Sequence, residues 1–171
     1  KIGLLPLYIH IYDIGCPGVR PRMEAFYETI AKQMEERGVE VVRTDDFCRL
    51  KPEFEKAVSD FEVAKVDAIV TLHMAYSPSL ESIEALTKTE LPIIVLDTTE
   101  TLEFTNEQSG GEVMYNHGIH GVMDMCSMLT RYGKEYIIAA GHYKNSPCID
   151  EACGYVRAIV SASALKNSKT G

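Results

Sequence analysis

The chain has 171 residues, 46% hydrophobic and 25% charged, which is typical of a globular domain with a full core. Its formal net charge of −8 argues against nucleic acid as a partner, because there is no excess of cations to displace counterions from phosphates. No apolar run approaches the roughly 20 residues that span a bilayer, and no signal-peptide pattern is present, so a membrane protein is not expected.

An apolar run over residues 2–8 predicts a first strand that is covered on both faces, and residues 13–18 supply a turn. The amphipathic helix that follows has Pro21 in its first turn and Gly38 just after its end. Its apolar face carries Met23, Phe26, Tyr27, Ile30 and Met34. A short second strand is predicted over residues 39–42.

Pro52 opens a second helix, and a third strand over residues 68–72 ends at His73. The pair Ser77-Pro78 predicts the cap and first residue of a third helix. The apolar faces of these two helices carry Phe54, Ala57, Val58 and Phe61, then Leu80, Ile83 and Leu86. The fourth strand is predicted over residues 92–96.

A polar loop over residues 100–115 precedes a fourth helix from about residue 117 to residue 131. We expect Ile119, Val122, Met123, Cys126 and Leu129 to face inward from this helix. A fifth strand over residues 136–140 and a last helix complete the pattern. The sequence predicts one domain over residues 1–166, with residues 167–171 as the start of a linker to a second domain.

Strictly alternating apolar strands and helices predict a three-layer αβα domain with a five-stranded parallel sheet, flavodoxin-like or Rossmann-like. Ligands of such sheets bind beyond the carboxyl ends of the strands. All five histidines are expected at this edge: His10, His73, His117, His120 and His142. No G-x-G-x-x-G segment, Walker loop or hydroxyl-rich phosphate loop is present, which disfavours a dinucleotide or flavin cofactor.

Five cysteines are scattered along the chain without a C-x-x-C pair: Cys16, Cys48, Cys126, Cys148 and Cys153. An odd and scattered set favours free thiols in a reducing compartment over a disulfide framework or a zinc knuckle. We therefore expect a cytoplasmic protein.

Residues 116–124 hold two histidines, His117 and His120, three residues apart at a helix start. With Asp124 they could form a helical metal cluster, although all three share one face only after a modest rotation. The alternative is a polar helix start in which Asp124 is solvated or caps a helix. A histidine that contacts a polar ligand is the favoured interpretation, and we expect no metal site in this chain.

Several stretches occur in a consistent order over nearly the whole chain: residues 1–8 (KIGLLPLY), 71–79 (TLHMAYSPS), 96–99 (LDTT), 116–121 (NHGIHG) and 141–142 (GH). Together they resemble the N-terminal domain of the L-fucose isomerase and L-arabinose isomerase superfamily, in particular the L-fucose isomerase-like branch. The resemblance implies a homo-oligomeric enzyme of carbohydrate metabolism that depends on Mn²⁺ or another divalent metal. Such aldose–ketose isomerases transfer a proton between C1 and C2 through an enediol.

The resemblance places the metal ligands and the catalytic residues in later domains, so this chain alone is expected to be inactive and to bind no metal. In arabinose isomerases, the histidine of the Asn-x-x-x-His-Gly motif contacts the sugar in a neighbouring subunit's active site. His120 is the matching position, with Asn116 as its companion. Fucose isomerases also use an arginine after the first strand. Arg20 is the nearest candidate, although its spacing departs from the family pattern.

The expected substrate-binding residues are His120, Asn116, His117, Arg20, His73 and Tyr76. A sugar and further copies of the protein are the expected partners. Two other functions fit the residues: a non-catalytic module that binds a sugar or another small ligand, and a metal hydrolase that uses His117, His120 and Asp124.

Overall fold

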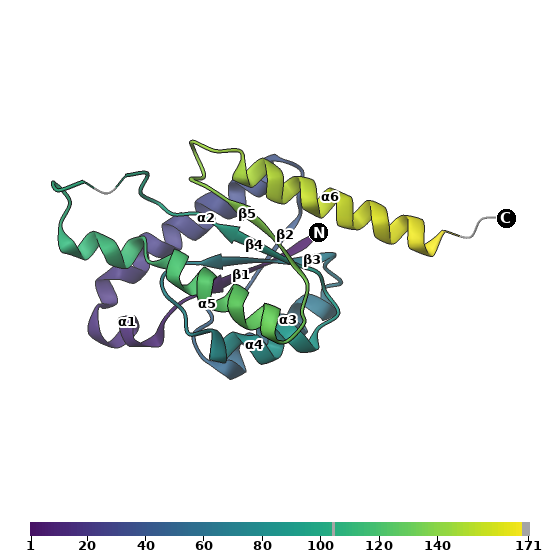
Figure 1. Cartoon of the computed structure of the whole chain (residues 1–171), viewed down its shortest axis with the longest axis horizontal. Coiled ribbons are helices and arrows are strands. Elements are labelled where there is room, and N and C mark those ends of the chain that lie inside the picture. Colours follow the sequence, from purple (N-terminus) through teal and green to yellow (C-terminus); the bar gives the residue numbers. More distant parts are fainter. Residues whose placement is uncertain (104, 169–171) are drawn as a thin grey trace.

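A computed structural model of the chain describes residues 1–103 and 105–168. These residues form a five-stranded parallel sheet with helices on both faces (Figure 1), which confirms the predicted three-layer fold. The strands are β1 (Ile2–Leu7), β2 (Val41–Arg43), β3 (Ala68–His73), β4 (Ile93–Asp97) and β5 (Tyr136–Ala140). Their order, β2-β1-β3-β4-β5, is that of flavodoxin-like sheets.

The helices pack on the two faces of the sheet. One face is covered by α2 (Arg20–Glu36) and α6 (Cys148–Asn167), and the other by α3 (Lys51–Val63), α4 (Ser79–Lys88) and α5 (Gly118–Arg131). Successive strand residues point to opposite faces, so Leu4 and Leu5 belong to different core clusters. The apolar strand composition therefore reflects burial on both sides.

Three short helices lie in the connections: α1 (His10–Gly15), η1 (Pro17–Val19) and η2 (Gly110–Tyr115). The turn predicted over residues 13–18 is thus largely helical. The loop predicted over residues 100–115 contains η2, and Phe104 within it lies outside the described residues. Helix α6 continues to Asn167, while residues 169–171 of the predicted linker are also outside the described part.

The predicted inward face of α5 is partly wrong: Val122 and Leu129 are buried as expected, but Ile119 is 39% exposed. Met123, expected to face inward, is 65% exposed, and Met125 is fully buried instead. The helix turns Gly118, Gly121, Val122, Met125 and Leu129 toward the sheet. Because two of the five inward residues are glycines, the apolar side chains alone predict an inward face that is rotated from the observed face of α5. Leu80 of α4 is likewise exposed rather than inward.

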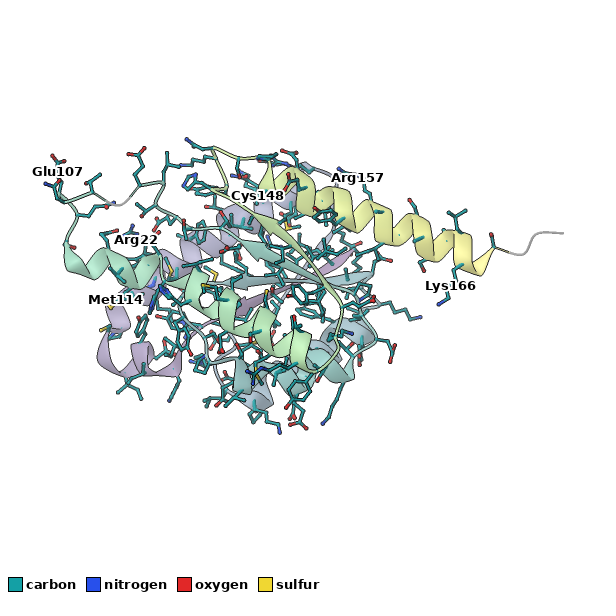
Figure 2. The ribbon with its side chains drawn as sticks, in the orientation of Figure 1. Arg22, Glu107, Met114, Cys148, Arg157 and Lys166 are labelled. Carbon is teal, nitrogen blue, oxygen red and sulfur yellow. The ribbon has the colours of Figure 1, made fainter. Side chains whose placement is uncertain are left out.

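One side of the sheet ends in the partly exposed strand β5, where Ile137 and Ile138 are 40% and 44% exposed. Helix α6 extends past the sheet, and Lys166 near its end lies far from the strands (Figure 2). A cavity of about 840 Å³ lies at the amino ends of β4 and β5, opposite to the edge where ligands were expected. None of the described helices has the length and apolarity of a membrane span. The five cysteines, all within the described residues, are free.

Candidate functional site

Three rings meet beyond the carboxyl end of β3. Tyr76 lies in the loop after this strand, and His117 and His120 lie at the start of α5. The ring centroid of His117 is 4.5 Å from that of His120 and 5.9 Å from that of Tyr76. We call Tyr76, His117 and His120 the ring row. His120 forms the exposed end of the ring row, and the contact with a substrate predicted for it from the sequence stays a prediction.

His73 lies beneath the helix that carries the two histidines and is only 4% exposed. A Cβ atom built on Gly121 would lie 2.4 Å from the His73 Cδ2 atom, and one on Gly118 would lie 2.7 Å from the His73 carbonyl oxygen. The absence of a side chain at these two positions lets the first turn of α5 rest directly on the end of β3. A direct contact between His73 and a substrate would require this helix start to move.

Neither ring nitrogen of His73 has a hydrogen-bond partner within the described residues. Burial lowers the pKa of His73 to about 3, and the nearby Asp124 carboxylate opposes this shift in part. The imidazole is therefore neutral at physiological pH. A buried neutral imidazole without partners is unusual, since buried polar groups are normally hydrogen-bonded.

Acid should destabilise the fold in part through His73. Its folded pKa of about 3 lies below the ordinary 6.5, so the unfolded chain binds the proton first and stability is lost as pH falls from about 6.5 toward 3. Between pH 7 and pH 5 this loss amounts to about 2 kcal/mol. His73→Leu removes it, so urea unfolding at these two pH values should show a smaller fall for the variant. Equal falls for both proteins would contradict the assignment.

The ion-paired carboxylates of Asp13 and Glu53 do not obscure this comparison, and Asp97, whose pKa is raised by burial, is present in both proteins. The guanidinium groups of Arg49 and Arg20 lower the pKa of Asp13 against the opposing effect of burial, and Arg49 does the same for Glu53. A lowered carboxyl pKa contributes stability that is present above the ordinary value and is lost only as pH falls through the folded value. Both groups therefore act below the pH range of the His73 test.

His117 is partly buried, as is Tyr76, whereas His120 is exposed. Burial lowers the pKa of His117 first, and the neighbouring His120 lowers it further. Its Nδ1 atom is buried and has no partner in the described part of the chain. A neutral His117 thus supports the exposed His120 ring by an edge-to-face contact with an interplanar angle of 61°.

Asp124 caps a helix. Its Oδ2 atom accepts a hydrogen bond of 3.1 Å from the backbone N–H of Ser79, the first residue of α4. The predicted cap, Ser77, makes no such bond, and Pro78 occupies the N-cap position. Asp124 therefore joins the middle of α5 to the start of α4 and complements the positive end of the α4 dipole.

The metal-cluster alternative gains no support from this geometry. Within residues 1–103 and 105–168, no group of three or more His, Cys, Asp or Glu side chains is placed to hold a metal ion. His117, His120 and Asp124 do not form such a group, because the Asp124 carboxylate is turned to α4.

Asp124→Ala should remove the cap and lower the free energy of unfolding by about 1 kcal/mol. Asp124→Asn keeps an acceptor oxygen and should lose less. Asp60→Ala, which removes an exposed carboxylate paired with Lys56 on α3, serves as the control and should change stability by less than about 0.5 kcal/mol. Urea denaturation measures all three, and an Asp124→Ala variant as stable as the control would refute the cap.

Asn116 is buried and its amide is fully engaged. Its Oδ1 accepts from the Thr101 backbone N–H at 2.9 Å, and its Nδ2 donates to Thr101 Oγ1 at 2.9 Å and to the Glu112 carbonyl at 3.0 Å. Asn116 thus fastens the two sides of the 100–115 loop just before the ring row. A role beside the substrate, predicted from the motif, stays a prediction.

Arg22 holds the same loop from α2. Its guanidinium pairs with Glu100 at 2.5 Å and with Glu112 at 3.0 Å, and it lies 3.9 Å from the centroid of the Tyr115 ring. Figure 2 shows Arg22 where α2 meets η2. The carboxylates of Glu112 and Glu100 raise the pKa of Arg22, so its guanidinium stays charged and these contacts are kept at physiological pH.

Arg20 belongs to a separate ion-pair network near the ends of β1 and β2. It donates to both carboxylate oxygens of Asp13 at 3.0 Å and also pairs with Asp46. Arg49 shares Asp13 at 2.6 Å. The structure therefore places Arg20 among carboxylates, apart from the ring row.

The two remaining histidines follow strand ends, as predicted, but neither joins the ring row. His10 is exposed at the start of α1, and His142 Nε2 lies 3.2 Å from the Glu100 carbonyl oxygen. Sequence reasoning missed a set of buried hydroxyls without partners in the described residues: Tyr8, Thr71, Ser77, Ser79 and Thr98. No signal in a single sequence identifies such groups, since each hydroxyl is ordinary in its local context.

Comparisons with known proteins leave the family open. No family model matches the chain and no curated protein matches its sequence. Function is therefore inferred from the fold, the ring row and the motif resemblance.

Proposed function

We propose that this chain is the N-terminal, substrate-contacting domain of a metal-dependent aldose–ketose isomerase. The observation that carries the proposal is the placement of His120. It is exposed at the first turn of α5, beyond the carboxyl end of a parallel strand, and its ring contacts His117, which in turn contacts Tyr76. In open α/β sheets, ligands bind at this edge.

The ring row lies at the surface and resembles one wall of a site. The cavities of about 840 Å³ and 210 Å³ are lined by residues of other regions, with no member of the ring row. A wall of this kind gains a closed pocket when another subunit or domain is placed against it. This is the reason for proposing that the domain also takes part in oligomer contacts.

The chemistry of the ring row suits a sugar. The exposed imidazole of His120 can donate or accept a hydrogen bond at a hydroxyl group, depending on its tautomer. The rings of Tyr76 and His117 offer an apolar surface for the C–H face of the sugar. Together these contacts would fix the orientation of the substrate, which an isomerase needs for proton transfer between two adjacent carbons.

The metal is assigned to other parts of the protein. The described residues do not fit a divalent-metal site, so no step of the reaction is placed on them. When bound elsewhere in the enzyme, the metal would polarise the sugar oxygens.

The proposal is tested by NMR of histidine side chains in the 171-residue chain during titration with L-fucose, L-arabinose and glycerol. We expect weak, saturable changes at His120 and His117 with a sugar. His10 and His142, which lie outside the ring row, are internal controls and should not respond. The same preparation with Mn²⁺ should show no isomerase turnover.

Two results would count against the proposal. Turnover by this chain with Mn²⁺ would place the metal site within it. Histidine spectra that are unchanged by either sugar would contradict the proposed contact between His120 and the substrate. Sugar binding together with a full-length protein that lacks isomerase activity would favour the non-catalytic binding module instead.

A further inference from the structure

His73 is the most deeply buried ionisable group near the ring row, and the proposed sugar contact does not use it. Its imidazole offers one donor and one acceptor, and neither has a partner within the described residues. A hydrophobic side chain of similar size would fill the same space without this cost. A polar ring retained in such a place is a candidate for a functional role.

The ring sits between β3 and the first turn of α5. The Cβ built on Gly121 meets His73 Cδ2 at 2.4 Å and Nε2 at 3.0 Å, and it also meets the backbone nitrogen of Ser77 at 3.1 Å. The Cβ built on Gly118 meets the His73 carbonyl oxygen at 2.7 Å and its Cβ at 3.2 Å. The height of α5 above the sheet is thus set by the His73 ring and the strand end on which it lies.

His117 and His120 occupy the same helical turn as these two glycines. A shift or rotation of this turn moves both imidazoles together, because the backbone between residues 117 and 121 is helical or begins the helix. The neighbouring fixed points lie outside the turn: Asn116 holds the loop before it, and Asp124 holds the next turn to Ser79. Within the turn itself, His73 makes the closest contacts with the two glycines, while the Ser77 backbone nitrogen lies 3.1 Å from the Cβ built on Gly121 and the Tyr76 ring contacts His117.

We infer that His73 is the positioning residue of the ring row: its buried ring sets the height and rotation of the α5 start that presents His117 and His120. The consequence for sugar turnover rests on the proposed function, whereas the placement of the two histidines does not. A side chain that only fills the core would affect stability and leave the ring row unchanged.

The experiment compares His73→Ala, His73→Phe and the parent chain by NMR of histidine side chains. His73→Ala removes the ring, so the start of α5 should move closer to β3 and the chemical shifts of the His117 and His120 side chains should change. His73→Phe keeps a planar ring between β3 and the glycines and should restore most of the parental pattern. Ile30→Ala opens a core cavity beneath α2 on the opposite face of the sheet and is the control for lost stability alone.

Unchanged His117 and His120 signals in a folded His73→Ala chain would overturn the inference. If that variant does not fold, His73→Leu, which also removes the planar ring, takes its place: changes in the His117 and His120 signals larger than those in the Ile30→Ala control support the inference, and unchanged signals overturn it. A sugar titration separates the two proposals. If the His117 and His120 signals change in the His73 variants but do not respond to sugar, the proposed function is contradicted and the positioning role of His73 is retained.

Discussion

Gly121→Ala is expected to lower the free energy of unfolding by about 2–3 kcal/mol, as overpacking of a tight interior does. The new methyl group would lie 2.4 Å from the buried His73 ring and 3.1 Å from the Ser77 backbone nitrogen. The His73 ring is buried under α5, and the backbone at Ser77 can move away only at a cost in free energy. Urea denaturation at pH 7 measures the loss.

Gly154→Ala is the matched control. Gly154 also lies inside a helix, α6, but a Cβ there meets nothing within 4 Å. Alanine has the higher helix propensity, so this variant should gain up to about 1 kcal/mol. A Gly121→Ala variant that is as stable as the parent would show that α5 does not rest on His73. Adding His73→Ala to Gly121→Ala should recover part of the loss, because the nearest clashing atom is removed.

The proposed function predicts that His120→Ala lowers kcat/KM for sugar isomerisation by the full-length protein about 10- to 100-fold, since one hydrogen bond to the sugar would contribute about 1–3 kcal/mol. The imidazole is exposed, so its loss should leave the thermal midpoint of the domain nearly unchanged. Steady-state kinetics with the preferred sugar measure the effect.

His10→Ala provides the kinetic control, because His10 is also exposed but belongs to α1 and is not a member of the ring row. It should retain the parental kcat/KM. A His120→Ala enzyme within twofold of the parent would argue against a sugar contact at this position. A large loss of thermal stability would instead assign His120 a structural role.

Most of the fold could be predicted from the sequence, because strand burial and helix amphipathicity leave periodic patterns. All five predicted strands are present. The largest displacement is that of β2, to Val41–Arg43 from the predicted residues 39–42, and β4 is shifted by one residue, to Ile93–Asp97. The short helix α1 was missed because residues 10–15 carry turn-forming residues and no buried face.

The site was less predictable. The sequence placed the histidines at the correct edge, since residues that follow parallel strands gather there. It could not show that His73 lies beneath α5, because the evidence is the space at two glycines rather than an apolar side chain. The cap formed by Asp124 on Ser79 joins residues 45 positions apart, and nothing local in sequence encodes it.

The contacts of Arg22 and Asn116 at the base of the 100–115 loop allow the outer end of the loop to change without a change in the sheet. Arg22 and Asn116 tie its base through Glu112, while Glu107 lies at its outer end, far from the strands (Figure 2). Insertions, deletions or a proteolytic cut near Glu107 would change the outer end and leave α5 in place. A change in the length of this outer end would therefore alter what can approach the edge of the sheet, while His117 and His120 keep their positions.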